Sequence, residues 1–391
     1  MLFEVLTSHR TRLMLAGSLL VALSVSAEAG PFRQDNLVSS VAGFATVTDP
    51  NLINPWGFAR SGAGPFWVSD QGQNVSTLYA VTGQTNVSKV NINAPSGFVS
   101  IPTTGSGPQG PTGLVANTNA ASFHVNNGGN GNRASFIFAN LNGTISAWNG
   151  GQSAFVQQTV QGAVFTALTV NQTQTQLYAA NAAGNIQVFD STFTPISLGA
   201  SAFVTPPSIL AQGLVPFGVK DLKGQVIVTY APPGRDADIA AVGGQGAVAI
   251  FDESGNLVRS FTDSNLAAPW GVTIAPAGFG PFANDLLVGN FSFGESEINA
   301  YDLLTGAFQG SIAIDTGNNS PGGLWDIGFG GGGSNGDPNT LYFTDGIDGE
   351  AHGLFGALTV PEPSSMALLG MGAILLGLRR NRSGQRGASP Y

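Results

Sequence analysis

The chain has 391 residues, no cysteine and a formal net charge of −9, with only 9% of its residues charged. The lack of cysteine excludes disulfides, thiolate metal sites and a cysteine nucleophile. Residues 30–360 contain 8 Lys and Arg against 20 Asp and Glu, which argues against nucleic acid as a partner, because phosphates need clustered cations.

The N-terminal segment has the order of parts typical of a secretory signal peptide. Arg10 and Arg12 precede an apolar run over residues 13–25, and Ala27 and Ala29 provide the small residues of a cleavage site. The apolar run is shorter than the ~20 residues that a membrane-spanning helix needs. We therefore expect signal peptidase to remove residues 1–29, with an uncleaved anchor as the alternative.

A repeat of about 50 residues organises the middle of the chain. Six short segments each open an apolar strand, five of them at a corner that contains Pro, Trp or Gly. Their central residues are Trp56, Thr112, Thr166, Phe217, Trp270 and Trp325. Each corner is followed by a second and a third apolar strand, separated by turn pairs such as Asn-Gly and Gly-Asn. A fourth strand, for example residues 257–261, completes the unit.

Four antiparallel strands repeated six times predict an all-β fold, a six-bladed β-propeller. The sixth unit stops after its third strand, residues 353–359. We expect residues 36–41, which precede the first unit, to supply the missing outer strand and so remove an exposed edge. A β-helix and a pair of β-sandwiches are the alternative architectures.

Polar residues recur at the ends of the six predicted second strands. They are Asp70, Asn140, Asn181, Tyr230, Asn290 and Asp345. In a propeller these positions lie on one face, so the sequence predicts a crown of oxygen atoms around one mouth of the axial channel. Such a crown suits Ca²⁺, which takes 6 to 8 oxygen ligands. Alternatively, each side chain bonds the backbone of the turn that follows it.

A second acidic cluster lies in the loop after the last of these strands. Asp345, Asp348 and Glu350 precede His352 and make this loop a candidate for a surface cation. The spacing lacks the D-x-[DN]-x-[DN]-G pattern of an EF-hand. Calcium is therefore the only cofactor that the sequence suggests.

Aromatic residues occupy equivalent corners on the same predicted face. Trp56, Phe217 and Trp270 either pack between blades or offer flat, rigid surfaces on which sugar rings could stack. In architecture the chain resembles gluconolactonase-type hydrolases, which hold a metal with acidic or amide residues at these corners. Only Asp326 is acidic among the corresponding positions here, so we predict no catalytic residue.

The C-terminal segment combines a short motif, an apolar run and a cluster of arginines. Val360, Pro361, Glu362 and Pro363 precede an uncharged stretch over residues 364–378, which Arg379 and Arg380 follow. These three ordered parts resemble the PEP-CTERM sorting signal of Gram-negative bacteria. The resemblance implies processing by an exosortase and transient membrane insertion through a short transmembrane helix. A packed terminal helix of the fold is the alternative.

The chain as a whole resembles an uncharacterised family of exported bacterial propellers, some of which carry this sorting tail. The resemblance rests on residues 48–57 and on residues 341–346 and 353–356. It agrees with the division that the motifs and the repeat predict, which is a signal peptide over residues 1–29, a propeller over residues 30–359 and a sorting signal over residues 360–391. We expect a surface or matrix protein that binds polysaccharide or protein without catalysis. A calcium-dependent hydrolase at the channel mouth is the alternative.

Overall fold

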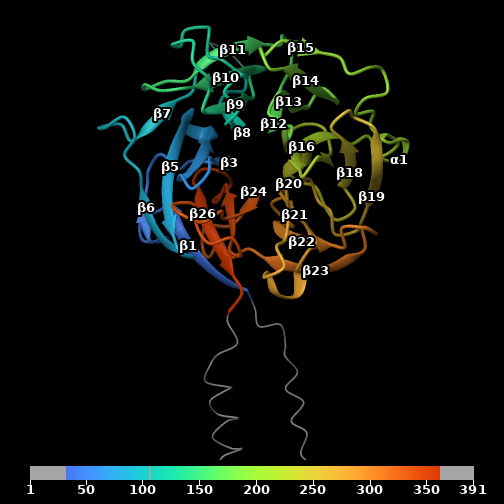
Figure 1. The fold of residues 1–391 in the computed structure, drawn as a ribbon. Helices are drawn as coiled ribbons and strands as arrows, with labels where there is room; N and C mark the ends of the chain where they lie inside the picture. Colours follow the sequence, from blue (N-terminus) through green and yellow to red (C-terminus); the bar gives the residue numbers. More distant parts are fainter. Residues whose placement is uncertain (1–31, 105–106, 362–391) are drawn as a thin grey trace, which may run out of the picture.

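The computed structural model describes residues 32–104 and 107–361 of the chain. Six β-sheets surround a central axis as the blades of a propeller (Figure 1). The six strands nearest the axis contact one another in a closed circle, from blade one through blade six and back to blade one. The predicted all-β, six-bladed propeller is confirmed.

The first three blades begin at the first three predicted corners. Blade one contains β3 (Pro55–Arg60), β4 (Phe66–Asp70), β5 (Val75–Thr82) and β6 (Asn86–Lys89), with β7 (Phe98–Ser100) also paired to β5. Blade two contains β8 (Pro111–Ala116), β9 (Phe136–Asn140), β10 (Thr144–Trp148) and β11 (Phe155–Thr159). Blade three contains β12 (Phe165–Val170), β13 (Gln176–Asn181), β14 (Asn185–Asp190) and β15 (Pro195–Ile196).

The other three blades follow the same order, and two short helices lie in the loops around blade four. Blade four contains β16 (Val215–Leu222), β17 (Gln225–Ala231), β18 (Ala247–Asp252) and β19 (Leu257–Thr262). Blade five contains β20 (Pro269–Ile274), β21 (Leu286–Asn290), β22 (Glu297–Tyr301) and β23 (Phe308–Ala313). Blade six contains β24 (Leu324–Phe329), β25 (Leu341–Asp345) and β26 (Leu354–Thr359). The helices are α1 (Pro207–Leu210) and α2 (Arg235–Ile239), and single 3-10 turns are η1 (Gln71–Gln73) and η2 (Gly280–Phe282).

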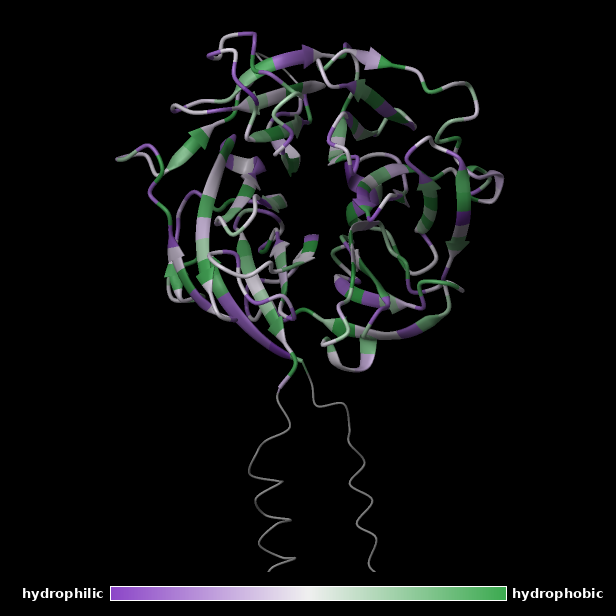
Figure 2. Ribbon diagram, viewed as in Figure 1, coloured by the Kyte–Doolittle hydropathy of each residue, from purple (hydrophilic) through white to green (hydrophobic). Residues whose placement is uncertain are grey.

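The N-terminal strand closes the ring, as predicted. Strand β1 (Arg33–Ser39) pairs antiparallel with β26, with Arg33 opposite Thr359, and β2 (Val47–Thr48) pairs beyond it. The strand begins three residues earlier than expected and ends at Ser39 rather than Val41. Its first half is hydrophilic, as Figure 2 shows, whereas Leu37 and Val38 are fully buried against blade one. Joining the two ends of the chain in one sheet removes an open edge.

The small residues at the corners have a steric cause. A Cβ atom on Gly113 would collide with the backbone of Leu168 in the next blade, and one on Gly271 would collide with that of Trp325. The inner strands of neighbouring blades can approach closely only because these positions lack a side chain. Four of the six corner residues are followed by such a glycine (Gly57, Gly113, Gly218 and Gly271), and Ala167 and Asp326 follow the other two. These glycines therefore belong to the ring geometry rather than to a functional site.

The strand directions define two faces. The inner strand of each blade begins at what we call the upper face and ends at the lower face. Because neighbouring strands within a blade are antiparallel, the second strands end at the upper face and the third strands end at the lower face. The corners and the ends of the second strands therefore share the upper face, as the sequence predicts.

Candidate functional site

The six predicted crown residues lie at the upper ends of the second strands. All six side chains are buried, with exposed fractions between 0% and 6%. Most of their hydrogen bonds stay within their own blade. Asp70 accepts from Thr77 N at 2.9 Å, and Asn140 donates to Thr144 O at 3.1 Å. Asn181 accepts from Val164 N at 3.1 Å, Asn290 accepts from Ala267 N at 3.1 Å, and Asp345 accepts from Gly323 N at 2.9 Å. Three of these bonds hold the segment that leads into the inner strand, and only Asn140 and Asn181, whose Oδ1 also accepts from Ala183 N, bond the turn that follows. The side chains therefore hold the backbone of their own blade, although Asp70 Oδ1, Asn140 Oδ1, Tyr230 OH and Asp345 Oδ2 have no hydrogen-bond partner.

The three carboxylates in and beside the acidic loop after β25 lie in three different environments. Asp345 is fully buried, Asp348 is exposed, and Glu350 pairs with Arg235. Across residues 32–104 and 107–361, no three His, Asp or Glu side chains are grouped as a metal site would require. Calcium binding therefore stays a prediction without a converging set of ligands.

A cavity of about 460 Å³ opens at the upper mouth of the channel. This upper cavity is lined on its apolar side by Trp56, Leu141, Val164, Pro216 and Phe217, and on its polar side by Asn54, Gln71, Arg235, Asp238 and Glu350. Its volume lies in the range of small-molecule sites, which are mostly apolar with a few convergent polar groups. It is the strongest candidate for a ligand site in the described chain.

A stack of flat groups forms one wall of the upper cavity and the floor beneath it. The Arg235 guanidinium lies 4.4 Å from the ring centre of Phe291, and Phe291 stacks on Trp325 at 4.1 Å. Trp325 in turn stacks on Trp56, with ring centres 3.5 Å apart. The stack holds the guanidinium in place, because a cation over an aromatic face is attracted by the ring.

The three predicted platform residues belong to this aromatic layer. Trp56, Phe217 and Trp270 are only 4–5% exposed and pack around Trp325 at ring-centre distances of 3.5–5.9 Å. Trp56 and Phe217 line the upper cavity. Trp270 faces the narrow throat of the channel instead, and its Nε1 donates to Thr166 O at 3.0 Å. Packing is thus the main role of the layer, and only the edges of two rings are available to a ligand.

The positive and negative charges of the upper cavity nearly cancel. Arg235 forms an ion pair with Glu350, whose side chain is 15% exposed. Asp238, on the same short helix as Arg235, is only 7% exposed. Burial raises the pKa of Asp238 to about 7, with Arg235 opposing this shift and Glu350 adding to it. Burial likewise raises the pKa of Glu350, against the effect of Arg235.

Several polar atoms of the upper cavity have no hydrogen-bond partner within the protein. Trp56 Nε1, Arg235 Nη1, Asp238 Oδ1 and Glu350 Oε1 are all buried and have no hydrogen-bond partner. Buried polar atoms are normally bonded, and an unpaired one costs about 1–3 kcal/mol. Two free donors and two free acceptors therefore belong to residues that line a space large enough for a ligand.

Sequence reasoning missed Arg235 and Asp238. Both lie on α2, in the loop that follows Tyr230, one of the predicted crown residues. The available signal was the scarcity of charged residues. Residues 30–360 contain only five arginines, and one of them, Arg235, is followed by aspartates at positions 236 and 238. A charge cluster in a charge-poor chain, placed after the end of a second strand, indicates the upper mouth.

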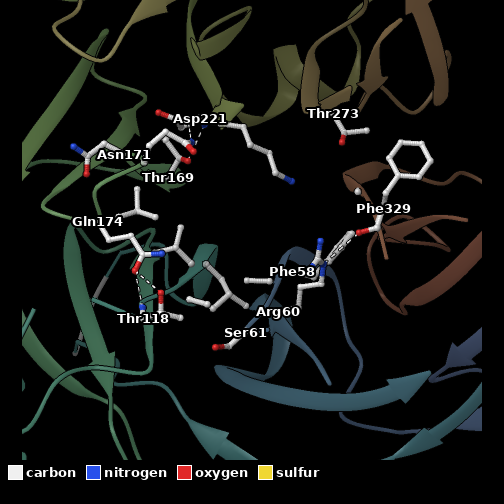
Figure 3. A pocket seen from close by; sticks show the side chains of 18 of the residues that line it. Phe58, Arg60, Ser61, Thr118, Thr169, Asn171, Gln174, Asp221, Thr273 and Phe329 are labelled. Carbon is white, nitrogen blue, oxygen red and sulfur yellow. Dashed lines mark hydrogen bonds between the residues drawn. The ribbon is translucent and has the colours of Figure 1, made fainter. Parts of the chain in front are cut away.

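A second cavity, of about 560 Å³, lies at the lower mouth of the channel. Figure 3 shows Arg60, Gln174 and Asp221 around its opening, each from a different blade. Its polar groups are largely bonded to one another: Gln174 accepts from Thr118 N at 2.6 Å, and Arg60 donates to Phe329 O at 3.4 Å. This lower cavity therefore offers a ligand fewer free groups than the upper cavity does.

The C-terminus carries a recognised sorting signal. Residues 359–382 match the PEP-CTERM protein-sorting motif, which marks bacterial proteins for export to the cell surface and implies processing by exosortase. Within residues 32–104 and 107–361, no helix is both long and apolar enough to cross a membrane. The predicted membrane-inserting stretch, the arginines that follow it, Glu362, Pro363 and the predicted signal peptide lie outside the described residues.

The chain is also similar to two uncharacterised proteins of Acanthamoeba polyphaga mimivirus. One is 28% identical over 72% of this chain and 69% of the viral protein, and the other is 27% identical over 73% and 75%. Similar solved structures include the WD40 β-propeller domain of Doa1, which is 9% identical with a TM-score of 0.47 and covers 85% of this chain and 98% of that one. Streptogramin B lyase is 13% identical with a TM-score of 0.49, and the match covers 84% of this chain and 98% of the lyase chain.

Proposed function

We propose that this exported propeller binds polysaccharide in its upper cavity and does not transform it. In finer detail, signal peptidase removes residues 1–29, residues 30–359 form the binding module, and residues 360–391 serve for sorting in a Gram-negative bacterium. Exopolysaccharide of the same surface is the expected ligand. The observation that carries the proposal is the set of unpaired polar atoms that face an aromatic-walled cavity.

The chemistry of the free atoms favours a sugar over other small ligands. Trp56 Nε1 and Arg235 Nη1 need acceptors, whereas Asp238 Oδ1 and Glu350 Oε1 need donors or a proton. An amine would satisfy only the acceptors, and a carboxylate would satisfy only the donors. A hydroxyl group both donates and accepts, so a ligand with several hydroxyls on one ring can satisfy the complete set.

The walls and the charge of the upper cavity indicate which class of sugar it would bind. Apolar ring edges and proline faces suit the C–H side of a sugar ring, while the polar groups meet its hydroxyls. Because Glu350 already neutralises Arg235, the cavity holds no free cation for a uronate. We therefore expect neutral polysaccharides to bind and polyuronates to bind weakly.

Binding of the full chain to isolated neutral exopolysaccharide, measured by calorimetry, tests this proposal. Removing the Asp238 carboxyl in Asp238→Ala should weaken binding about tenfold or more, since hydrogen bonds of charged groups contribute ~1.5–3 kcal/mol. Asp236 provides the matched control, because it is exposed on the same helix and does not line the upper cavity. Asp236→Ala should bind as the parent does.

Three results would contradict the proposal. They are an absence of binding to any polysaccharide of the producing cell, equal affinity in Asp238→Ala and the parent, and release of reducing ends on mixing. The last result, if it depended on added calcium, would support the hydrolase alternative. Thermal unfolding of each variant shows whether a loss of affinity reflects a loss of fold.

A further inference from the structure

We propose that the lower face of the propeller faces the membrane when the C-terminal segment holds the protein, so that the upper cavity opens outward. The inference starts from the position at which the chain leaves the fold and from the sorting motif that begins there. It requires that the C-terminal segment is retained. It does not depend on which ligand the upper cavity takes, so it can fail or succeed independently of the proposed function.

The strand order fixes the face from which the C-terminal segment leaves. Strand β24 runs from the upper to the lower face, β25 returns antiparallel to it, and β26 runs downward again. Thr359, the last residue of β26, therefore lies at the lower face. The N-terminal end of β1 lies beside it, because Arg33 pairs with Thr359.

Packing holds this exit point against the lower face of blade five. The side chain of Val360 lies next to Gly280, in the loop that joins β20 to β21. Phe32, at the other end of the described chain, stacks on Phe279 and Phe282 of the same loop at ring-centre distances of 4.9 and 5.8 Å. Pro276, at the start of that loop, lines the lower cavity. Phe32 and Val360, near the two ends of the described residues, are thus packed against the lower face of blade five.

The link between this exit point and the apolar stretch is short. Only Val360, Pro361, Glu362 and Pro363 separate Thr359 from residue 364, where the uncharged stretch begins. Four residues span at most about 14 Å when fully extended. The inner strands of six residues, at ~3.3 Å per residue, make the ring about 20 Å thick. A link of this length cannot pass around the ring, so the upper face cannot face the membrane, and we expect the lower face to lie nearest the apolar stretch.

The charges of the lower face are consistent with a narrow gap rather than direct contact with lipid. Its turns carry Asp190, Asp252 and Asp302, which anionic headgroups would repel, and the exposed cations Arg60 and Lys223, which they would attract. The Debye length is about 8 Å at physiological salt, so a gap of about 14 Å screens most of this repulsion. The short link and the acidic turns can therefore coexist.

The absence of cysteine makes the orientation measurable by single-cysteine labelling. We choose one exposed residue on each face of blade five, beside the exit point, and one on each face of blade three, opposite to it. The lower-face variants are Ala277→Cys and Thr173→Cys, and the upper-face variants are Ser264→Cys and Ala183→Cys. Each full-length variant is reconstituted in phosphatidylethanolamine–phosphatidylglycerol vesicles and treated with a polyethylene-glycol maleimide too large for a gap of about 14 Å.

The expected result is a several-fold slower reaction at both lower-face cysteines than at both upper-face cysteines. Dissolving the same vesicles in detergent should make the four rates similar, which controls for differences in intrinsic reactivity. Equal rates in vesicles would overturn the proposal. Slow reaction at both blade-five cysteines with fast reaction at both blade-three cysteines would also overturn it, because the ring would then stand on its edge. A chain that does not float with the vesicles would contradict the membrane attachment that the proposal needs.

Discussion

Lys220 on the inner strand of blade four forms an ion pair with Asp326 on the inner strand of blade six, with Nζ 2.8 Å from Oδ1. Asp326 Oδ2 also accepts from Phe58 N of blade one at 3.1 Å. Both charged residues line the throat, a space of only about 50 Å³ between the two cavities. One carboxylate therefore joins three blades and helps to close the channel between its two mouths.

This pair predicts an asymmetric effect of mutation. Lys220→Met should lower the free energy of unfolding by about 1–3 kcal/mol, because it leaves a carboxylate that is 6% exposed without its cation. The expected loss of stability is smaller than the loss on breaking a fully buried ion pair. Lys220 is 30% exposed, and two backbone amides still donate to Asp326 in the variant. Urea unfolding provides the measurement. The double variant Lys220→Met/Asp326→Asn should recover part of the loss, and a single variant as stable as the parent would refute the argument.

Closure of the ring by β1 gives a second prediction. Leu37 is fully buried between blades six and one, whereas Leu304 in a turn of blade five is 84% exposed. Leu37→Ala should reduce stability by about 2–5 kcal/mol, as expected when a core leucine is truncated. The same substitution at Leu304 should change stability by less than about 0.5 kcal/mol. Similar losses from both changes in chemical denaturation would mean that β1 does not contribute to the ring.

The sequence predicted the ring because each blade repeats the same local rules. The corner, the close-approach glycine and the turn pairs each act over a few residues, so their spacing is visible without a structure. The closing strand was also predictable, since the sixth unit lacked one strand and only the N-terminal segment could supply it. The two-residue strand β2 and the extra strand β7 have no such signal, because they are set by loop packing.

The candidate site was less predictable than the fold. The six residues at the strand ends follow the repeat, yet most of their hydrogen bonds hold the backbone of their own blade. Arg235 and Asp238 break the repeat, since they lie on a helix inserted in one loop of blade four. The position of Arg235 over Trp325 of blade six depends on how the blades meet around the axis. A repeat pattern does not indicate which residues from different positions in different blades come into contact.

Threonine hydroxyls that join neighbouring blades give a third prediction. Thr166 Oγ1 donates to Phe217 O of the next blade at 2.7 Å, and Thr112 Oγ1 donates to Phe165 O at 2.8 Å. Thr166→Val keeps the shape and the β-branch but leaves a buried carbonyl unpaired, which should cost about 1–3 kcal/mol. Thr262→Val, at an exposed position of β19, should change stability by less than about 0.5 kcal/mol. An equal effect of both substitutions on the urea midpoint would argue against a role for the inter-blade bond.

The buried carboxyl of Asp345 should make the stability of the propeller fall as the pH rises from about 4 to about 7. Burial raises the pKa of Asp345 from 3.8 to about 7. Between these values the unfolded chain releases a proton that the folded chain retains, so each step in pH favours unfolding. Asp345→Asn still offers Gly323 N an acceptor but cannot ionise, and it should therefore show a smaller fall in melting temperature between pH 5 and pH 8 than the parent protein. Asp348→Asn removes a charge from the same loop at an exposed position and should keep the parent's profile. A profile for Asp345→Asn as steep as that of the parent would show that this carboxyl does not control the pH dependence.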